Sequence, residues 1–222
     1  GGRPVQVSYK VGEGSYSCTE YALEHVIDDR QRANARNQLN LDENATRLLT
    51  GKHLIHQDRV WATTFFGTGL WTWEYAGVAA APAANQFLRF DDDNSVPIEV
   101  IDQFKDHQEE ITGYRPNTVI LGASVRRALR VNPSIQEVVK YTQRGVADEA
   151  LMASLFDVEN VMTARSIYNS ADEGQTDNMT WNVDPRSFWM GYIDPNPSDD
   201  SPTATMMFNW EGLLDGQANA AG

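Results

Sequence analysis

Two histidines in this chain have a spacing that could begin a metal site. His53 and His56 lie three residues apart, and Asp58 follows two residues later. Imidazole nitrogens and carboxylate oxygens are common zinc ligands. A third and a fourth ligand at a comparable spacing are missing, so we interpret the histidines as surface or packing residues. We predict neither a metal nor a cofactor.

A run of polar side chains, Asp91-Asp92-Asp93-Asn94, offers the oxygen ligands that calcium prefers. The run lacks the alternate spacing and the glycine of an EF-hand loop. We therefore favour a solvated acidic turn that caps a helix beginning at Pro97.

Motifs for phosphate binding and for nucleophilic catalysis are present only as fragments. Gly12-Glu13-Gly14 and Gly67-Thr68-Gly69 lack both the third glycine and the Gly-Lys-Ser/Thr of phosphate-binding loops. The chain has no Gly-x-Ser-x-Gly elbow, and Cys18 has no obvious histidine partner in its neighbourhood. A triad assembled from distant residues stays open. We predict that the chain is not an enzyme.

Tryptophans are a further candidate feature, because indole rings can stack on sugars or bases. More often they bury area in a core or at a subunit contact. One alternative function is therefore an acidic carbohydrate-binding or hydrolytic domain. Its neighbouring carboxylates, Glu109 and Glu110, would point to different faces of a helix and make a poor acid and base pair. The tryptophans considered are Trp71, Trp73, Trp181, Trp189 and Trp210.

The segment 114–169 is well punctuated but carries no catalytic constellation, which is typical of a structural building block. Thr118-Val119-Ile120-Leu121 predicts a buried strand that ends at Gly122. Residues 124–130 predict a helix, and Asn132 with Pro133 supplies the cap and the first residue of another. The inward residues of that second helix are predicted to be Ile135, Val138, Val139 and Thr142.

The same segment predicts a third helix, which Asp148 would cap and which would turn Leu151, Leu155 and Phe156 inward. Residues 158–168 then return to an extended strand. Further helices are predicted over 19–35, over 41–64 behind the cap Asn40, and from Pro97 onward. The inward residues of the last would be Ile98, Ile101, Phe104 and Ile111. Residues 65–96 are expected to be an irregular connection, and 186–193 and 203–210 to be strands.

The order of these segments resembles the axial domain of tailed-bacteriophage major capsid (coat) proteins, which share the encapsulin-related Johnson fold. The resemblance is carried by residues 115–122, by the helix at Asn132-Pro133, and by Leu155-Phe-Asp-Val-Glu-Asn-Val-Met162. Segments 20–30 and 205–210 fit in the same order. The resemblance spans most of residues 15–210.

The resemblance implies an α+β fold with two domains. Residues 1–18 would be the end of an extended loop, and residues 19–96 a peripheral domain built on a spine helix over 41–64. Residues 97–222 would form an axial domain of mixed sheet flanked by helices, with returning strands. A helix over 41–64 would be about 35 Å long. The resemblance also implies an N-terminal arm and further C-terminal strands outside this sequence.

Composition limits the partners of the 222-residue chain. Its 31 acidic and 18 basic residues give a net charge of −13, and only four of the basic residues are lysine. Tight tracking of phosphates is therefore not expected, and packaged DNA would be enclosed without sequence-specific contact. One cysteine excludes disulfides within the chain. No apolar run approaches the roughly 18 residues that a membrane-spanning helix needs, so we predict no membrane partner.

The function implied by the resemblance is mechanical. Many copies would assemble, as hexamers and pentamers, into the icosahedral shell of a bacteriophage or prophage that encloses double-stranded DNA. Portal, scaffold, prohead protease and decoration proteins are the implied partners. The protein would be part of the virion and would assemble in the bacterial cytoplasm. The alternative within the same architecture is an encapsulin-like nanocompartment shell.

Seven residues are candidate contacts between subunits. Arg126, Arg127 and Arg130 form a small basic helix face, which could pair with Asp91, Asp92 and Asp93 of the next subunit. Lys10 lies in the implied extended loop. Some capsid proteins of this kind form a covalent lysine to asparagine bond, and Lys10 is the only lysine placed to attempt it. No partner asparagine is identifiable, so no cross-link is predicted.

Overall fold

The computed structural model describes residues 19–35, 40–140, 148–198 and 201–207. The chain divides into two compact units, and the one comprising residues 25–206 contains all the described helices and strands. Described residues 19–24 and 207 belong to the other unit. None of the helices in the described ranges is long and apolar enough to cross a membrane.

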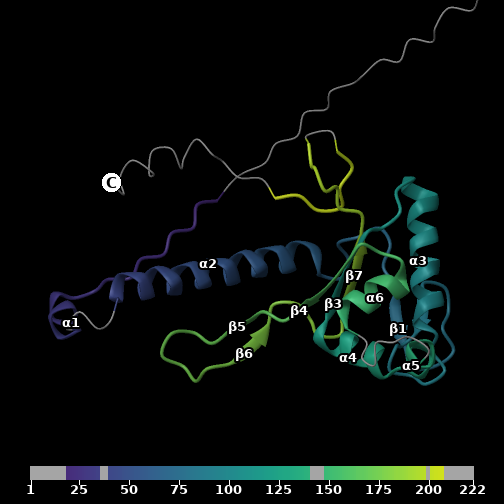
Figure 1. The fold of residues 1–222 in the computed structure, drawn as a ribbon, viewed down its shortest axis with the longest axis horizontal. Coiled ribbons are helices and arrows are strands. Elements are labelled where there is room, and N and C mark those ends of the chain that lie inside the picture. The colour runs from purple at the N-terminus through teal and green to yellow at the C-terminus, as the bar shows by residue number, and fades with distance from the viewer. Residues whose placement is uncertain (1–18, 36–39, 141–147, 199–200, 208–222) are drawn as a thin grey trace, which may run out of the picture. The chain divides into compact units, whose positions relative to one another are not determined.

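Helices and short strands are mixed along the chain, so the fold is α+β, as predicted (Figure 1). The helices are α1 (Asp29–Asn34), α2 (Leu41–Phe65), α3 (Pro97–Thr112), α4 (Ala123–Val131), α5 (Pro133–Lys140) and α6 (Glu149–Phe156). The strands are β1 (Ala76–Val78), β2 (Gln86–Leu88), β3 (Thr118–Gly122), β4 (Asn160–Ala164), β5 (Ile167–Asn169), β6 (Met179–Trp181) and β7 (Phe188–Gly191).

The central sheet has three strands in the order β4-β3-β7. β3 pairs in parallel with β4, Val119 opposite Val161, and antiparallel with β7, Ile120 opposite Trp189. The sheet is therefore mixed. α4, α5 and α6 lie between β3 and β4 in the chain, as the crossover between parallel strands requires. Every residue of β3 is buried, which confirms the strand predicted from its apolar run.

The hydrophobic core lies between this sheet and the helices α3 to α6 (Figure 1). Because side chains alternate along a strand, Val119 and Leu121 of β3 face these helices while Ile120 faces the opposite side. The buried core members are Phe90, Ile101, Val119, Leu121, Leu129, Ile135, Val139, Leu151, Met152, Phe156 and Val161.

Side-chain caps begin α5 and α6 where the sequence predicts them. Asp148 Oδ1 accepts a hydrogen bond from Leu151 N at 2.8 Å at the start of α6. Asn132 Oδ1 accepts one from Ser134 N at 3.0 Å at the start of α5. The Asn132 side chain is buried, and its Nδ2 also donates to the carbonyl oxygens of Phe90 and Ser95. This asparagine therefore fixes both a helix and the loop before α3.

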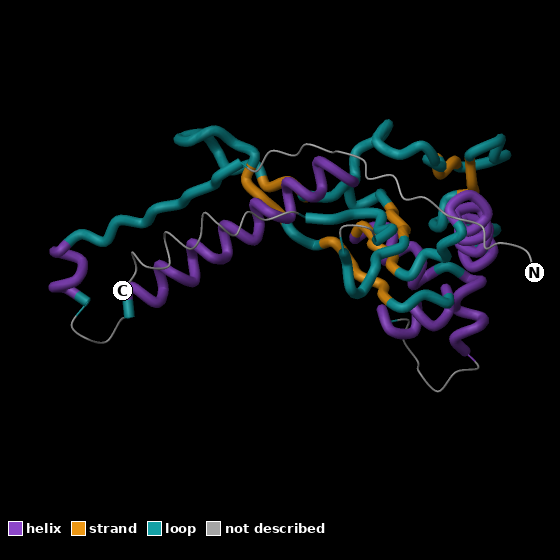
Figure 2. The backbone as a smooth tube through the Cα atoms, turned by 90° about the horizontal axis from the view of Figure 1, so that it is seen from above, coloured by secondary structure: helices purple, strands orange, loops and turns teal. Residues whose placement is uncertain are grey.

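Helix α2 is one unbroken helix of 25 residues (Figure 2). Its cap is the predicted one, because Asn40 Oδ1 accepts a hydrogen bond from Glu43 N at 3.3 Å. Only Ala62 among its residues is fully buried. Leu48, Leu54 and Val60 are exposed. Apolar side chains of α2 are therefore partly exposed.

Two sequence predictions near the N-terminus and after α6 were wrong in extent. The helix predicted over 19–35 is limited to Asp29–Asn34, because the apolar side chains before it remain exposed and so provide no burial to stabilise a longer helix. The strand predicted over 158–168 is two strands in different sheets, because pairing with β3 ends at Ala164 and pairing with β6 begins at Ile167.

Smaller differences concern individual positions. Val138 and Ile111 were predicted to face inward but are exposed, since each lies at the margin of its helix stripe. Residues 65–96 contain one short parallel pair, β1 and β2, instead of being wholly irregular. The strand predicted over 203–210 is absent from its described residues, 203–207. Thr142 and Gly145 lie outside the described residues.

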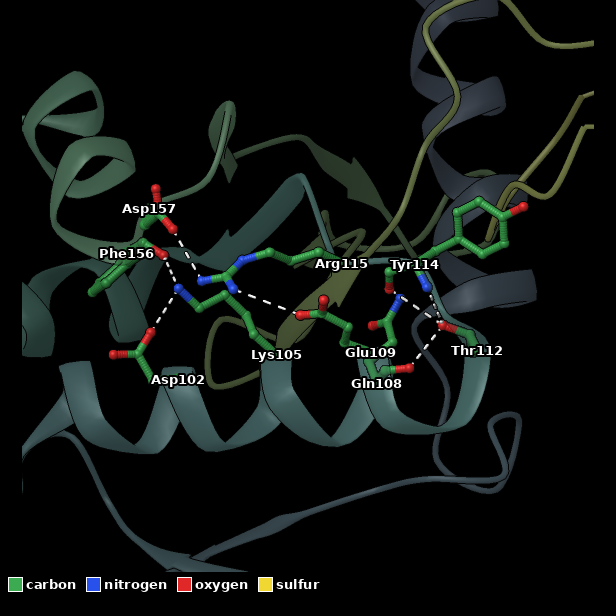
Figure 3. Close-up of polar contacts among 9 residues, drawn as sticks. All are labelled: Asp102, Lys105, Gln108, Glu109, Thr112, Tyr114, Arg115, Phe156 and Asp157. Atoms are coloured by element: carbon green, nitrogen blue, oxygen red, sulfur yellow. Dashed lines mark hydrogen bonds and ion pairs between the residues drawn. The ribbon is translucent and has the colours of Figure 1, made fainter.

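A buried lysine connects α3 to the end of α6 (Figure 3). Lys105 is completely buried, and its Nζ donates a hydrogen bond to the carbonyl oxygen of Phe156. Asp102 Oδ1 lies 2.6 Å from the same ammonium. A second cation, Arg115, lies 3.0 Å from the carboxylate of Asp157 and 3.6 Å from that of Glu109. Two basic side chains thus hold the C-terminal end of α6.

We expect Lys105→Met to lower the free energy of unfolding by about 1–3 kcal/mol, because it leaves a buried carbonyl without its donor. Asp102→Asn should cost less than about 1 kcal/mol, since the Asp102 side chain is 51% exposed. Urea unfolding followed by tryptophan fluorescence measures both. Equal losses in the two variants would contradict the assigned role of the buried ammonium.

Replacing two different glycines by alanine should change the stability of the protein in opposite directions. A Cβ on Gly122 would collide with the carbonyl group of Pro185 and lie 2.7 Å from Asp184 O, whereas one on Gly51 meets nothing. Gly122→Ala should therefore cost about 1–3 kcal/mol of unfolding free energy. Gly51→Ala should add about 0.5–1 kcal/mol, because glycine is unfavourable within a helix. Thermal unfolding of the two variants beside the parent protein measures the effects, and stabilisation by Gly122→Ala would refute the assignment.

Candidate functional site

An open groove of about 1360 Å³ lies beside the edge strand β7, between the end of α2, the 66–77 segment, the 87–91 segment, α3 and α4. Twelve of its 35 lining residues are phenylalanine, tyrosine or tryptophan, and five are charged. Such concave apolar surfaces are typical of binding sites for other molecules or chains. The groove is therefore the candidate functional site of the described residues.

One aromatic cluster joins α2 to the sheet. The Trp61 ring lies 5.3 Å from that of Phe66 and 6.2 Å from that of Trp189 on β7. Trp71 lies 6.0 Å from Trp189, and its Nε1 donates a hydrogen bond to Phe65 O at 2.7 Å. These ring separations are those of favourable aromatic pairs. The end of α2 is thereby held against one end of the groove.

A second aromatic cluster lies along α3. The Tyr75 and Phe104 rings are 4.4 Å apart, and the rings of Trp73 and His107 meet edge to face at 4.5 Å. Phe104 also lies 6.4 Å from Phe188 on β7. Burial raises the pKa of the Tyr75 hydroxyl above its usual value. The wall formed by α3 is therefore largely uncharged.

The 66–75 segment is held in shape by a carboxylate. Glu74 Oε1 accepts hydrogen bonds from the backbone N–H groups of Gly69 at 2.6 Å, Leu70 at 3.0 Å and Trp71 at 3.2 Å. Gly69 has a φ of +81°, a left-handed conformation that favours glycine. The Gly69 bond, followed by those from Trp71 and Leu70, lowers the pKa of Glu74, against a smaller opposing effect of desolvation.

Three arginines give the groove its positive charge. Arg89 Nε lies 3.3 Å from Asp91 Oδ1 and is thus paired. Arg127 on α4 and Arg186 before β7 also line the groove. Neither of these two has an ion-pair partner in the part of the chain that the structure describes. The groove thus combines aromatic walls with two guanidinium groups available to an anion.

The predicted basic face is divided between different environments. Arg126 Nε lies 3.4 Å from Glu149 Oε1 of its own chain, within ion-pair range but without hydrogen-bond geometry. Arg127 faces the groove, and Arg130 is exposed outside it. The structure therefore brings together Arg127 and Asp91, which both line the groove. Their contact with another subunit stays a prediction, and Lys10 lies outside the described residues.

The acidic turn is solvated, as predicted, but its capping role was wrong. Asp91 and Asp93 are exposed, and Asp92 Oδ1 accepts a hydrogen bond from Asn94 N at 2.9 Å. The cap position of α3 is Val96, which provides no side-chain hydrogen bond. The turn therefore closes on itself before α3 begins. Among described residues, no three metal-ligating side chains come together.

Sequence reasoning missed most of the groove. It considered Trp71, Trp73 and Trp189, but neither Trp61 nor the phenylalanines that complete the clusters. A signal was available, because residues 61–75 contain six aromatic side chains, Trp61, Phe65, Phe66, Trp71, Trp73 and Tyr75. Arg186 had no such signal, since only the pairing of β7 with β3 places it near α4.

Part of the chain is similar to a curated protein sequence. The chain is 34% identical over 83 residues to a protein named "Major capsid protein" of Burkholderia phage BcepMu. The match covers 37% of this chain and 27% of that protein. No protein-family profile matches the chain. The similarity to a phage capsid protein is therefore established for part of the chain.

A solved structure extends the likeness in fold. A phage-related protein from Bordetella bronchiseptica superposes with a TM-score of 0.56 at 20% sequence identity. The superposition covers 81% of this chain and 54% of that one. At this identity the likeness concerns the fold alone. The chain spans about half the length of the solved protein and about a quarter of the capsid protein in these matches.

We expect Glu74→Gln to lower stability near neutral pH and to matter less in acid. Because folding lowers the pKa of Glu74 below 4.5, its contribution is complete above 4.5 and is lost as pH falls through the folded-state pKa. Thermal unfolding of both proteins across acidic and neutral pH measures the difference. A stability difference that grew on acidification would contradict the role of the carboxylate. The control variant is Glu110→Gln, because Glu110 is an exposed glutamate on α3.

Proposed function

We propose that this chain is a structural subunit of a phage-type viral shell, a major capsid protein and not an enzyme. The observation that carries the proposal is the 34% identity over 83 residues to a phage major capsid protein. The α+β fold, similar to that of a phage-related protein, agrees with it. Many copies would assemble into an icosahedral shell around packaged double-stranded DNA, and the protein would be part of the virion.

The distribution of apolar surface supports a function that depends on contacts between copies. Exposed apolar side chains on α2 and an open aromatic groove are features expected of a subunit that buries them by assembly. Helix α2 would be the spine of the peripheral domain, and the sheet with α3 to α6 would be the axial domain. Hexameric and pentameric rings close a shell from one kind of chain.

The remaining partners follow from the proposed role. Portal, scaffold, prohead protease and decoration proteins would act on the assembling shell, which forms in the bacterial cytoplasm. A net charge of −13 disfavours tight binding to packaged DNA, so the DNA would be enclosed without sequence-specific contacts. The seven predicted contact residues, with Arg127 in the groove, are the first candidates for the surfaces that join subunits.

Electron microscopy after negative staining tests the proposal. The complete reading frame that contains this chain, expressed in bacteria, should give uniform hollow shells, tubes, or rings of five or six subunits. Dispersed small particles at every salt concentration and pH would overturn it. A glycan array and a hydrolase screen of the same preparation should be negative, and a positive result there would favour the carbohydrate-binding alternative.

A further inference from the structure

The hairpin formed by β5 and β6 has two unlike faces. On one face, the Tyr168 ring lies 4.2 Å from the guanidinium carbon of Arg59 on α2. Because side chains alternate along a strand, Ile167, Met179 and Trp181 lie on the opposite face, with Ile167 directly across from Trp181. These three side chains are 41%, 58% and 41% exposed. The hairpin thus rests on α2 and presents an uncovered apolar face.

The connection between β5 and β6 is an acidic tip with a defined shape. Asn169 Oδ1 accepts hydrogen bonds from Ala171 N at 3.1 Å and Asn178 N at 2.9 Å. Asn169 Nδ2 donates to Asp177 Oδ1 at 2.7 Å. Asp172 and Glu173 at the tip are exposed and have no ion-pair partner among residues with described positions. Two carboxylates are therefore presented by a preorganised loop.

The hairpin and the groove are complementary in chemistry. The groove offers aromatic walls and the guanidinium groups of Arg127 and Arg186. The hairpin offers exposed apolar side chains and the carboxylates of Asp172 and Glu173. In its own copy the hairpin is attached to α2 through Arg59 and Tyr168. Opposite charges beside matching apolar surfaces specify the register of a contact and suppress wrong partners.

We propose that the β5–β6 hairpin of one copy docks in the aromatic groove of a second copy, with Asp172 and Glu173 paired to Arg127 and Arg186. The inference rests on the proposed shell function and names a surface that would join its subunits. The two surfaces are different parts of the same chain, so the contact is head to tail. Repeated contacts of this kind close into rings when the rotation between copies allows.

The charges of the groove disfavour the alternative contact, in which the acidic turn 91–93 of a neighbouring copy would bind there. Asp91 already lies beside Arg89 within the groove, and Arg126 already lies beside Glu149. The acidic turn of a neighbour would therefore meet a carboxylate as well as the arginines. The hairpin tip meets two arginines of the groove, Arg127 and Arg186, that have no ion-pair partner among the described residues.

Charge reversal in the full chain tests the contact. Arg127→Glu with Arg186→Glu should slow assembly at low ionic strength at least about tenfold, measured by light scattering, because rim charges act mainly on association rate. Asp172→Arg with Glu173→Arg should do the same. Combining the four substitutions should restore the rate to within about threefold of the parent.

Matched controls reverse the same number of charges outside both surfaces. Arg30→Glu with Lys140→Glu is the control for the groove, and Glu110→Arg with Glu137→Arg is the control for the tip; all four residues are exposed. Parent-like rates in the groove and tip variants, or no recovery in the combined variant, would overturn the docking. If the parent forms shells, either result leaves the shell function standing.

Disulfide trapping tests the same contact without requiring shells. In a Cys18→Ser background, a copy with Arg127→Cys is mixed with an isotope-labelled copy carrying Glu173→Cys and oxidised. The mixed dimer should form several-fold more than with Lys140→Cys in place of Arg127→Cys, because a disulfide needs neighbouring Cα atoms. Equal yields would overturn the docking. If the mixed disulfide forms as expected but the parent protein assembles no shells, only the shell function is overturned.

Discussion

The buried ammonium of Lys105 is the contact on which the arrangement of helices around the sheet depends. Helix α6 has eight residues and is too short to be stable alone. Its C-terminal carbonyl groups carry partial negative charge, and a cation placed there stabilises it. Lys105 supplies that charge from α3, and Asp157 then turns the chain in a left-handed conformation. Immediately afterwards, Asn160 N donates to Asn117 O and β4 begins beside β3.

The face of the sheet opposite the helical core holds the end of α2. Val119 and Leu121 face the helical core, so Ile120 and its neighbour Trp189 on β7 lie on the other side. Trp189 is close to Trp61 and Trp71, and these rings attach the end of α2 to the sheet. The groove is thus formed where the sheet, α3 and the end of α2 meet. Most of α2 remains outside that contact and is exposed.

The features that sequence reasoning predicted correctly depend on local chemistry. The caps at Asn40, Asn132 and Asp148 each act on a backbone N–H two or three residues away, so short motifs suffice to place them. β3 is recognisable because a strand buried on both faces is apolar throughout.

The features that sequence reasoning missed depend on residues distant in the chain. Nothing within 158–168 indicates that β4 joins β3 while β5 joins β6. Arg126 and Arg127 are adjacent, yet one meets Glu149 and the other lines a groove whose walls come from segments distant in the chain. The buried state of Lys105 is likewise set by α6, 51 residues away. Residue type alone would place Lys105 in solvent, because lysine is rarely buried without a partner.

Net charge makes the few unpaired cations more significant for assembly. Two copies that each carry −13 repel one another at long range, which favours dispersed chains over random association. Approach is then least unfavourable where a positive patch on one copy meets a negative patch on the other. Exposed apolar side chains add attraction that has no direction, since hydrophobic burial depends on area and not on orientation. In a chain with both properties, the apolar surfaces drive association, and the positions of its unpaired charges select which surfaces meet.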